Sequence, residues 1–281
     1  MRLRKNFLPR TLADIWCFLL IATFIPITFV FELTIVLPEF HDFGGLFYWI
    51  TLIAGVFLIM NIKGNMLACM LVDTSIKNEI LIPPTDPDER KLWRMCSVCE
   101  TMAPPRSWHC NTCKTCILKR DHHCFFTGCC VGHRNHRYFL MFLIFLIIGS
   151  LYTTIYNSIY LWYLHTETYA NYFTLFKMVF PMLMFTVDSS WTNFYLLIYE
   201  LNVIAFAYSL VLFVYHGQII LRGGVIHERS ACKYDLGWKK NLEMVLGTKM
   251  HKVWLSPFVE SPLPHDGINW QGFLKQTPKN R

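Results

Sequence analysis

Hydrophobic residues in this chain gather into long blocks that are separated by polar segments. A helix that crosses a bilayer takes about 20 mostly apolar residues. Three blocks clearly satisfy this length, and they are residues 13–37, 46–72 and 138–164. A fourth block, residues 193–221, contains Glu200 and Asn202 but keeps the same apolar character. The pattern therefore predicts an all-α polytopic membrane protein with four transmembrane helices.

One further apolar segment, Tyr169 to Val187, is long enough to cross a membrane but contains Lys177 and Pro181. Aromatic residues and a single cation are typical of the membrane boundary. We therefore interpret this segment as an interfacial or half-inserted helix. A fifth span here would also carry the basic C-terminal tail across the membrane.

The positions of Lys and Arg predict the orientation, because basic residues concentrate on the cytosolic side. Residues 1–10 contain four of them and residues 73–137 contain ten, whereas residues 38–45 contain none. The segment between the third and fourth blocks contains only Lys177, and the tail after Leu221 again contains ten. Both termini and the long loop are therefore expected to lie in the cytosol.

This orientation predicts four regions along the chain. They are residues 1–72, the cytosolic N-terminus with the first two helices; residues 73–137, a cytosolic cysteine-rich domain; residues 138–221, the last two helices with a hydrophobic luminal segment; and residues 222–281, a cytosolic C-terminal tail. The first block lacks the small-residue cleavage site of a signal peptide, so we expect it to be retained as an anchor.

Composition and charge agree with a membrane protein. The chain is 54% hydrophobic and only 16% charged, whereas charged residues are about a quarter of an ordinary soluble domain. The net charge of +7 is explained by the orientation and by attraction to anionic lipid headgroups. Nothing in the pattern indicates nucleic-acid binding.

Cysteines are concentrated in the predicted cytosolic loop, where eight of the eleven fall between Cys96 and Cys130. Disulfides rarely persist in the cytosol, so the cluster indicates metal binding. Hydrophobic periodicity disappears after the polar linker "PPTDPDERK". A small module with almost no apolar core usually needs a metal to fold.

The spacing of the cysteines supports zinc. Two thiolates in a C-x-x-C turn can converge on one ion, and the loop contains several such turns with histidines between them. The candidate ligands are Cys96, Cys99, His109, Cys110, Cys113, Cys116, His122, His123, Cys124, Cys129 and Cys130. Two tetrahedral zinc sites use eight of these eleven residues. The spacing alone leaves open which three remain.

The chemistry of the loop is open to two interpretations. A purely structural zinc module would be a scaffold that binds other proteins. Asp121, His122 and Cys124 instead have the residue types of a thiol nucleophile, its base and the carboxylate that orients the base. A thiol near an imidazole and a metal centre can have a lowered pKa, which increases the amount of reactive thiolate.

The loop as a whole resembles the DHHC protein S-acyltransferases, or palmitoyltransferases. The residues that carry the resemblance are "CSVC" at 96–99, "PPRSWHC" at 104–110, "CKTC" at 113–116, "DHHC" at 121–124 and "CVGHRNHRYF" at 130–139, in the family's order and spacing. Four predicted spans with this loop between the second and third also match that family. The resemblance is strong in the loop and weaker in the spans.

The resemblance implies two structural Zn²⁺ ions, each held by three cysteines and one histidine. Carried over to this chain, the first ligand set is Cys96, Cys99, His109 and Cys116. The second ligand set is Cys110, Cys113, His123 and Cys130. Because the two sets interleave along the chain, they are expected to hold the loop as one rigid body.

The resemblance also implies roles for the remaining residues. Cys124 would accept the acyl chain from acyl-CoA as a thioester, His122 would be the general base, and Asp121 would hold the His122 tautomer. The basic residues proposed to contact the CoA phosphates are Lys119, Arg120, Arg134 and Arg137. Ordinary cytosolic positive charge is an equally good explanation for these four.

The chain departs from the family pattern at several positions. Phe126 replaces a common tryptophan, Cys129 a common asparagine and Trp108 a frequent histidine. The segment after the fourth span, "VIHE" at 225–228, keeps only Glu228 of a threonine-rich motif. Asn241 in "YDLGWKKNLEMVLG" matches an asparagine that supports the loop in the family, although it could equally be a helix cap or a surface amide.

The sequence therefore predicts a protein-cysteine S-palmitoyltransferase that transfers a long-chain acyl group from palmitoyl-CoA to cysteines of membrane-associated proteins. The alternatives are a catalytically silent membrane scaffold and a RING-like ligase module, although RING spacing differs from this cluster. The expected location is the endoplasmic reticulum or Golgi membrane, with the active site facing the cytosol.

Overall fold

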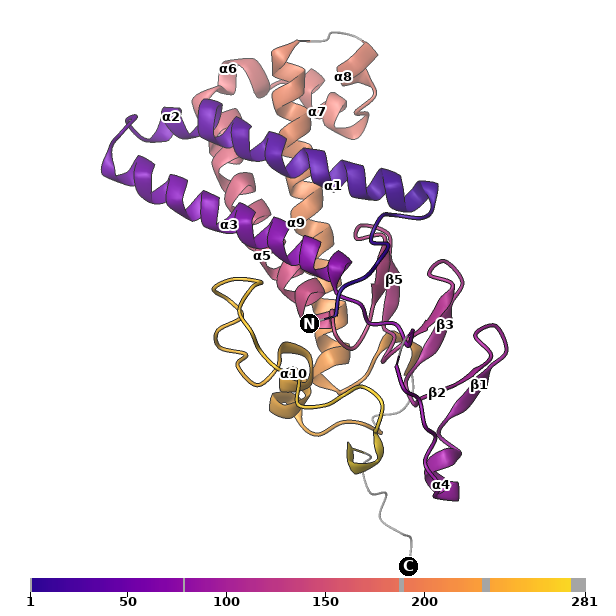
Figure 1. Cartoon of the computed structure of the whole chain (residues 1–281). Helices are drawn as coiled ribbons and strands as arrows, with labels where there is room; N and C mark the ends of the chain where they lie inside the picture. Colours follow the sequence, from indigo (N-terminus) through magenta and orange to yellow (C-terminus); the bar gives the residue numbers. More distant parts are fainter. Residues whose placement is uncertain (1, 78, 187–189, 229–232, 274–281) are drawn as a thin grey trace, which may run out of the picture. The chain divides into compact units, whose positions relative to one another are not determined.

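A computed structural model of the chain describes residues 2–77, 79–186, 190–228 and 233–273. The chain divides into two compact units (Figure 1). The first unit contains Met1–Ile21, Lys63–Phe142 and Val214–Arg281, and the second contains Ala22–Ile62 and Leu143–Phe213. All of the metal-ligating and catalytic candidates fall in the first unit.

Within the described residues, four helical segments are long and apolar enough to cross a membrane, as predicted. They are Leu12–Phe40, Leu46–Leu71, His136–Leu164 and Trp191–Leu221. The first segment consists of α1 (Leu12–Phe31), a π-helical turn (Glu32–Val36) and α2 (Leu37–Phe40). The second segment is α3 (Leu46–Leu71), and the third is α5 (His136–Ile159) with a π-helical turn (Tyr160–Leu164). The fourth segment is α9 (Trp191–Leu221). These helices fit a multi-pass membrane protein.

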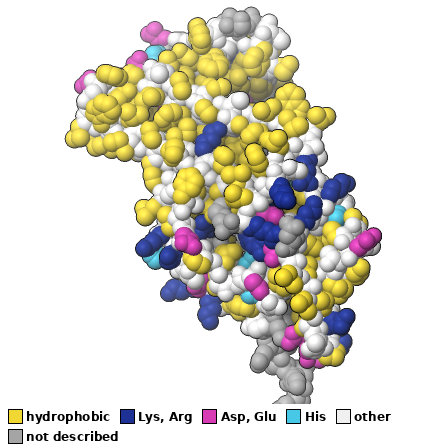
Figure 2. Space-filling model, in the orientation of Figure 1, with side chains coloured by type: hydrophobic (Ala, Val, Ile, Leu, Met, Phe, Trp, Pro, Cys, Tyr) yellow, Lys and Arg dark blue, Asp and Glu magenta, His cyan; other side chains and the backbone are white. Residues whose placement is uncertain are grey.

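Figure 2 shows that the visible surface of the helices is largely hydrophobic. Leu20, Ile53 and Val211 are among the side chains that are more than half exposed. Apolar surface of this extent is unfavourable in water and favourable in a lipid hydrocarbon layer. The exposed surface therefore supports the membrane assignment independently of helix length.

The second unit contains the segment that we predicted to be interfacial. It forms three short helices, α6 (Thr166–Tyr169), α7 (Tyr172–Val179) and α8 (Leu183–Thr186), while Val187 lies outside the described residues. None of the three is long enough to cross a membrane. Lys177 donates a hydrogen bond of 2.7 Å to Asn193, so its charge has a polar partner.

In the first unit, the described strands form three short antiparallel hairpins that follow one another along the chain (Figure 1). The hairpins are β1 (Arg94–Cys96) with β2 (Thr101–Ala103), β3 (Trp108–Cys110) with β4 (Thr115–Ile117), and β5 (His122–Cys124) with β6 (Cys129–Val131). Each strand has only three residues. Isolated two-stranded hairpins of this size are not stable in water without further links.

The turns of these hairpins depend on left-handed backbone conformations. Glu100 and Lys114, each directly after a C-x-x-C pair, have φ of 49° and 52°. Gly128, before β6, has φ of 58°, and a Cβ there would lie 3.0 Å from Pro9. Glycine is therefore needed at 128 both for its conformation and for its lack of a side chain.

The remaining short elements belong to the linker and the C-terminal tail. They are α4 (Pro87–Arg90), the 3-10 turns at Ile226–Glu228 and Gln271–Phe273, and α10 (Trp238–Leu246). Asn241 of α10 donates hydrogen bonds to Leu221 O and Asp235 Oδ1, and accepts one from Leu236 N. It ties the end of α9 to the tail and is not a cap of its own helix.

Arg106 and Glu228 connect the second hairpin to the segment after α9. The Arg106 guanidinium donates to both Glu228 carboxylate oxygens, at 2.8 and 2.5 Å, and lies over the rings of Tyr234 and Trp270. The Arg106 side chain is only 2% exposed. Glu228, the one residue of its motif that the sequence retains, therefore anchors the tail to the cysteine-rich region.

Candidate active site and metal centres

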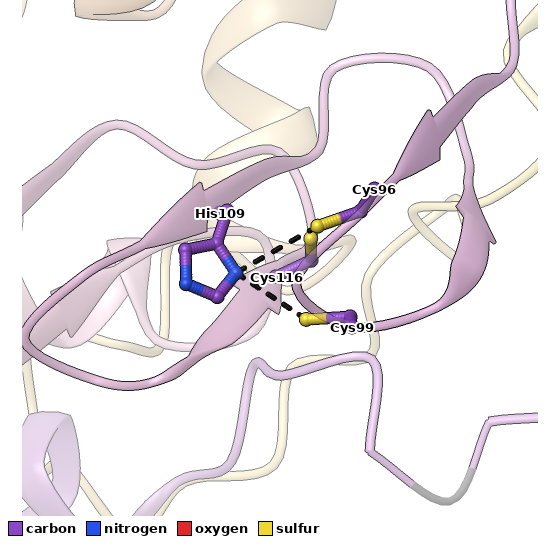
Figure 3. Close-up of side chains that lie close together, drawn as sticks. All are labelled: Cys96, Cys99, His109 and Cys116. Carbon is purple, nitrogen blue, oxygen red and sulfur yellow. Dashed lines mark hydrogen bonds between the residues drawn. The ribbon is translucent and has the colours of Figure 1, made fainter.

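The first group of metal-binding side chains comes from the first two hairpins. It consists of Cys96, Cys99, His109 and Cys116, whose ligand atoms all lie within 4.8 Å of one another. Figure 3 shows the His109 ring turned toward the cysteine sulfurs. Its Nδ1 lies 3.3 Å from Cys99 Sγ and 3.8 Å from Cys96 Sγ.

The second group comes from the second and third hairpins. It consists of Cys110, Cys113, His123 and Cys130. His123 Nδ1 lies 3.4 to 3.7 Å from the three sulfurs, and the sulfurs of Cys113 and Cys130 are 3.7 Å apart. Because the middle hairpin supplies side chains to both groups, metal binding would join all three hairpins.

Both groups fit zinc. A tetrahedral site with Zn–S distances of about 2.3 Å and a Zn–N distance of about 2.0 Å has sulfur–sulfur edges of about 3.8 Å and sulfur–nitrogen edges of about 3.5 Å. The observed separations match these edges. Three cysteines and one histidine are also a common donor set for structural zinc.

Asp14, at the start of α1, contacts the second group and was not predicted from the sequence. Its Oδ1 lies 3.2 Å from His123 Nε2, on the opposite side of the ring from the sulfurs. Its Oδ2 accepts a hydrogen bond from Thr11 N, and Asp14 N donates to Thr11 Oγ1, which is the reciprocal arrangement of a capping box. Asp14 is fully buried. A carboxylate in this position orients a metal-ligating histidine.

We expect replacement of Asp14 by asparagine to weaken zinc binding at the second group by about tenfold or more, as is typical when the outer partner of a ligating histidine is lost. The rate of zinc transfer from the purified protein to a chromogenic chelator measures this effect. Thr11→Ala, which removes the capping hydroxyl but keeps the carboxylate, is the matched control. Equal transfer rates in wild type and Asp14→Asn would contradict the assignment.

Asp121, His122 and Cys124 lie together at the third hairpin. Asp121 Oδ2 lies 2.8 Å from His122 Nδ1, and Cys124, two residues further along β5, has its side chain on the same face of the strand as His122. Asp121 Oδ1 accepts a hydrogen bond of 3.0 Å from Ile226 N. The "VIHE" segment therefore contacts the aspartate through its backbone, even though its threonines are missing.

The electrostatics favour a thiolate beside a protonated imidazole. Burial alone disfavours the Cys124 thiolate, but the neighbouring His122 imidazole leaves the pKa of Cys124 below its ordinary value. Burial likewise disfavours the His122 imidazolium, yet Asp121 and Cys124 raise the pKa of His122 to about 9. Asp121 is held ionised, because the adjacent imidazoles of His122 and His216 keep its pKa well below the usual value despite burial.

Cys129 lies opposite Cys124 in the third hairpin. Its thiol is 1% exposed, contacts Thr127 Oγ1 at 3.4 Å and donates to Cys69 O at 3.5 Å. It therefore packs against the end of α3. At 1% exposure, Cys129 is even less accessible than Cys124, which is 6% exposed.

The four basic residues predicted to contact CoA lie in different environments. Lys119 is 4% exposed, and burial lowers its pKa to about 7. Arg137 donates to Val259 O and Tyr138 Oη inside the protein. Arg120 donates to His109 O, and Arg134 pairs with Glu79 at 2.8 Å while keeping about a quarter of its side chain exposed. Only Arg120 and Arg134 are accessible to a phosphate in this conformation.

Comparison with known proteins gives consistent results. A family model described as "DHHC palmitoyltransferase" matches residues 89–233. A Danio rerio protein named "Probable palmitoyltransferase ZDHHC24" is 31% identical over 244 residues, which are 85% of this chain and 81% of that protein. Its Rattus norvegicus namesake is 34% identical over 231 residues, covering 76% of this chain and 75% of that protein. The Homo sapiens namesake is 47% identical over a shorter stretch of 60 residues, 21% of each chain.

Proposed function

Because the chain belongs to the DHHC palmitoyltransferase family and is a protein S-palmitoyltransferase, we propose that Cys124, His122 and Asp121 carry out its reaction. The observation that supports these roles best is the 2.8 Å contact between Asp121 Oδ2 and His122 Nδ1, with Cys124 on the same strand as His122. The alternatives of a silent scaffold and of a RING-like module have no observation in their favour.

In the first step, His122 Nε2 takes the proton from the Cys124 thiol. The resulting thiolate attacks the carbonyl carbon of acyl-CoA, a carbon–sulfur bond to Cys124 forms, and the bond to the CoA sulfur breaks. The CoA sulfur leaves with the proton that His122 received. Asp121 keeps the proton on His122 Nδ1, so that Nε2 faces Cys124, and it stabilises the imidazolium.

In the second step, His122 takes the proton from a substrate cysteine. The substrate thiolate attacks the Cys124 thioester, the acyl group moves to the substrate sulfur, and Cys124 leaves and regains a proton from His122. One thioester replaces another, so the step needs little driving force. The main requirement is that both thiols meet at the membrane surface.

The substrates that we propose are palmitoyl-CoA and cysteines of membrane-associated proteins. A long acyl chain gains about 0.8 kcal/mol for each methylene group that leaves water, which favours a reaction centre next to transmembrane helices. β6 and α5 are separated by only four residues, so the third hairpin lies next to the start of the third span. Arg120 and Arg134 are the proposed contacts for CoA phosphates, whereas Lys119 and Arg137 are assigned to the interior.

We further propose that the two cysteine-and-histidine groups bind one structural Zn²⁺ each. The zinc ions, when bound, would cross-link the three hairpins and contribute folding free energy to a region with almost no apolar core. They would not contact the acyl group, because all four protein ligands close each site. Their role is therefore to hold β5, which carries both His122 and Cys124.

We propose the domain limits and orientation that the sequence predicts. The cysteine-rich domain, residues 73–137, and the tail, residues 222–281, lie on the cytosolic face of the endoplasmic reticulum or Golgi membrane. Residues 1–72 and 138–221 supply the four spans. The positive-inside distribution of Lys and Arg supports this orientation. Attachment of a membrane-impermeant reagent to a cysteine introduced before Leu3 or into residues 38–45 would test it.

The test of the proposed roles is covalent labelling of the purified protein with a radioactive or clickable palmitoyl-CoA. We expect a label that neutral hydroxylamine removes, because hydroxylamine cleaves thioesters. A label that survives hydroxylamine, or no label on the zinc-loaded wild type, would contradict a Cys124 thioester.

The raised pKa of His122 predicts the pH dependence of this labelling. Folding raises the pKa of His122 to about 9, so His122 stays protonated below this pH and loses its proton as the pH rises through it. The protonated imidazole supplies the proton that the CoA sulfur takes when it leaves, so the labelling rate should fall above about pH 9. In Asp121→Asn the fall should occur at lower pH, because the anion that raises the His122 pKa is gone. An unchanged pH profile in that variant would contradict the role of Asp121.

A further inference from the structure

A second histidine, His216 of α9, lies beside the proposed catalytic residues. Its Nδ1 is 3.1 Å from Asp121 Oδ2, the same oxygen that lies 2.8 Å from His122 Nδ1. His216 is 4% exposed and Asp121 is 1% exposed. His216 is more than ninety residues from Asp121 in the chain, and nothing in the family resemblance or the spacing of the loop singled it out.

Three groups from different parts of the chain therefore contact the Asp121 carboxylate. Oδ2 faces the imidazoles of His122 and His216, and Oδ1 accepts the backbone N–H of Ile226. A buried carboxylate has no water to complete its hydrogen bonds, so each protein donor contributes to holding it in place. Removing one of these contacts allows the carboxylate to rotate.

The ring of His216 is itself held by packing. The His122 and His216 rings have centroids 4.9 Å apart, and the Phe139 ring lies edge-on to both, at 4.8 and 4.9 Å. The three rings form one contact group, so a change at His216 reaches His122 through both the carboxylate and the phenyl ring. Phe139 belongs to α5, which is part of the third span, whereas His216 belongs to α9, the fourth span.

Asp121, His122 and His216 are also close enough to offer three ligand atoms to a metal ion. His122 Nδ1 lies at an ordinary hydrogen-bond distance from Asp121, which matches the requirement that His122 keep a proton on Nδ1. His216 Nδ1 is a buried nitrogen in close contact with the same carboxylate but without a hydrogen bond of good geometry. We therefore interpret this group as a carboxylate that two imidazoles contact.

We propose that His216 is a positioning residue for acyl transfer: its Nδ1 lies against Asp121 Oδ2 and so fixes the carboxylate that orients His122. This inference rests on the proposed roles of Asp121, His122 and Cys124. His216 does not contact the acyl group. Its contribution is to keep His122 Nε2 directed at the Cys124 thiol through both steps.

The amide side chains of Asn and Gln distinguish this role from a general need for a histidine-sized group. Asn places an N–H close to the position of histidine Nδ1, whereas Gln places it near Nε2. His216→Asn should therefore keep the single-turnover labelling rate within about threefold, and His216→Gln and His216→Leu should lower it about tenfold, as expected for loss of one polar contact with a charged group. The concentration of palmitoyl-CoA at half-maximal rate should stay unchanged, because His216 does not bind CoA.

The experiment measures labelling rates of the purified, zinc-loaded variants over a range of palmitoyl-CoA concentrations. Gln218→Ala, an exposed change two residues further along α9, is the matched control and should match wild type. Unchanged rates in His216→Gln and His216→Leu would overturn the inference, as would equal losses in His216→Asn and His216→Gln. If His216→Leu fails to fold, the Asn and Gln pair still decides the question.

The same assay separates this inference from the proposed function. Cys124→Ser tests the nucleophile: if it keeps its hydroxylamine-sensitive label, the proposed catalytic roles are wrong, and the inference falls with them. If Cys124→Ser loses the label while the His216 variants keep the wild-type rate, the catalytic roles stand and only the role of His216 is wrong.

Discussion

Cys124→Ser should remove the hydroxylamine-sensitive label from the protein. Serine retains the size of the side chain, but its hydroxyl is far less acidic than a thiol whose pKa is already lowered by His122. Loss of an activated nucleophile reduces the rate by at least about a hundredfold, which places the label below detection in a short assay. Gel-based detection of bound palmitate, with and without hydroxylamine, measures it.

The neighbouring cysteine supplies the matched control for this result. Cys129 lies directly opposite Cys124 in the third hairpin but is buried against Cys69. Cys129→Asn introduces the residue that is common at this position in the family, and it should retain the label. Loss of label in Cys129→Asn together with retention in Cys124→Ser would exchange the roles of the two thiols and contradict our assignment.

Loss of the second metal-binding group should have the next largest effect. We expect the wild-type protein to contain about two zinc ions per chain and Cys113→Ser to contain about one. Labelling in that variant should fall by about a hundredfold, because a displacement of His122 and Cys124 by about 1 Å is sufficient for such a loss. Elemental analysis of purified protein and the labelling rate measure the two effects together.

The two groups should not be equivalent. His123 of the second group is the direct neighbour of His122 on β5, whereas the first group, Cys96, Cys99, His109 and Cys116, lies on the other two hairpins. Cys99→Ser should therefore also lose about one zinc but retain more labelling than Cys113→Ser. Cys17→Ser, a thiol of α1 outside both groups, should keep both ions. A zinc content of about one in wild type would contradict the two-site assignment.

The local spacing of cysteines and histidines predicted much of the candidate site. C-x-x-C turns place two sulfurs on one side of a tight turn whatever surrounds them, and the ligand sets implied by the family resemblance are the groups that lie together in the structure. The sequence left several roles open for Asn241, including a helix cap. In the structure Asn241 lies inside α10 and donates to Leu221 O at the end of α9. This contact joins residues that are distant in the chain, so the local sequence pattern could not predict it.

The basic residues show why charge alone is a poor guide to a ligand contact. Lys119 and Arg120 are adjacent in the sequence and equally plausible as phosphate contacts. Lys119 is buried and its pKa is lowered to about 7, whereas Arg120 remains partly exposed. Whether a side chain near a turn points into the protein or into solvent depends on the packing around it, and the pattern of charges in the sequence does not predict this packing.

The sequence by itself determined the four apolar spans, the cysteine-rich region between the second and third, and the Asp-His-His-Cys run. These features depend on the hydrophobicity and spacing of residues that are near one another in the chain, so they can be read without knowledge of the tertiary structure. Only the tertiary structure brought Asp14 to His123, and Ile226 and His216 to Asp121. Each of these contacts joins residues about a hundred positions apart, so it depends on how the helix ends and hairpins pack. The structure therefore decided which groups orient the two histidines on β5.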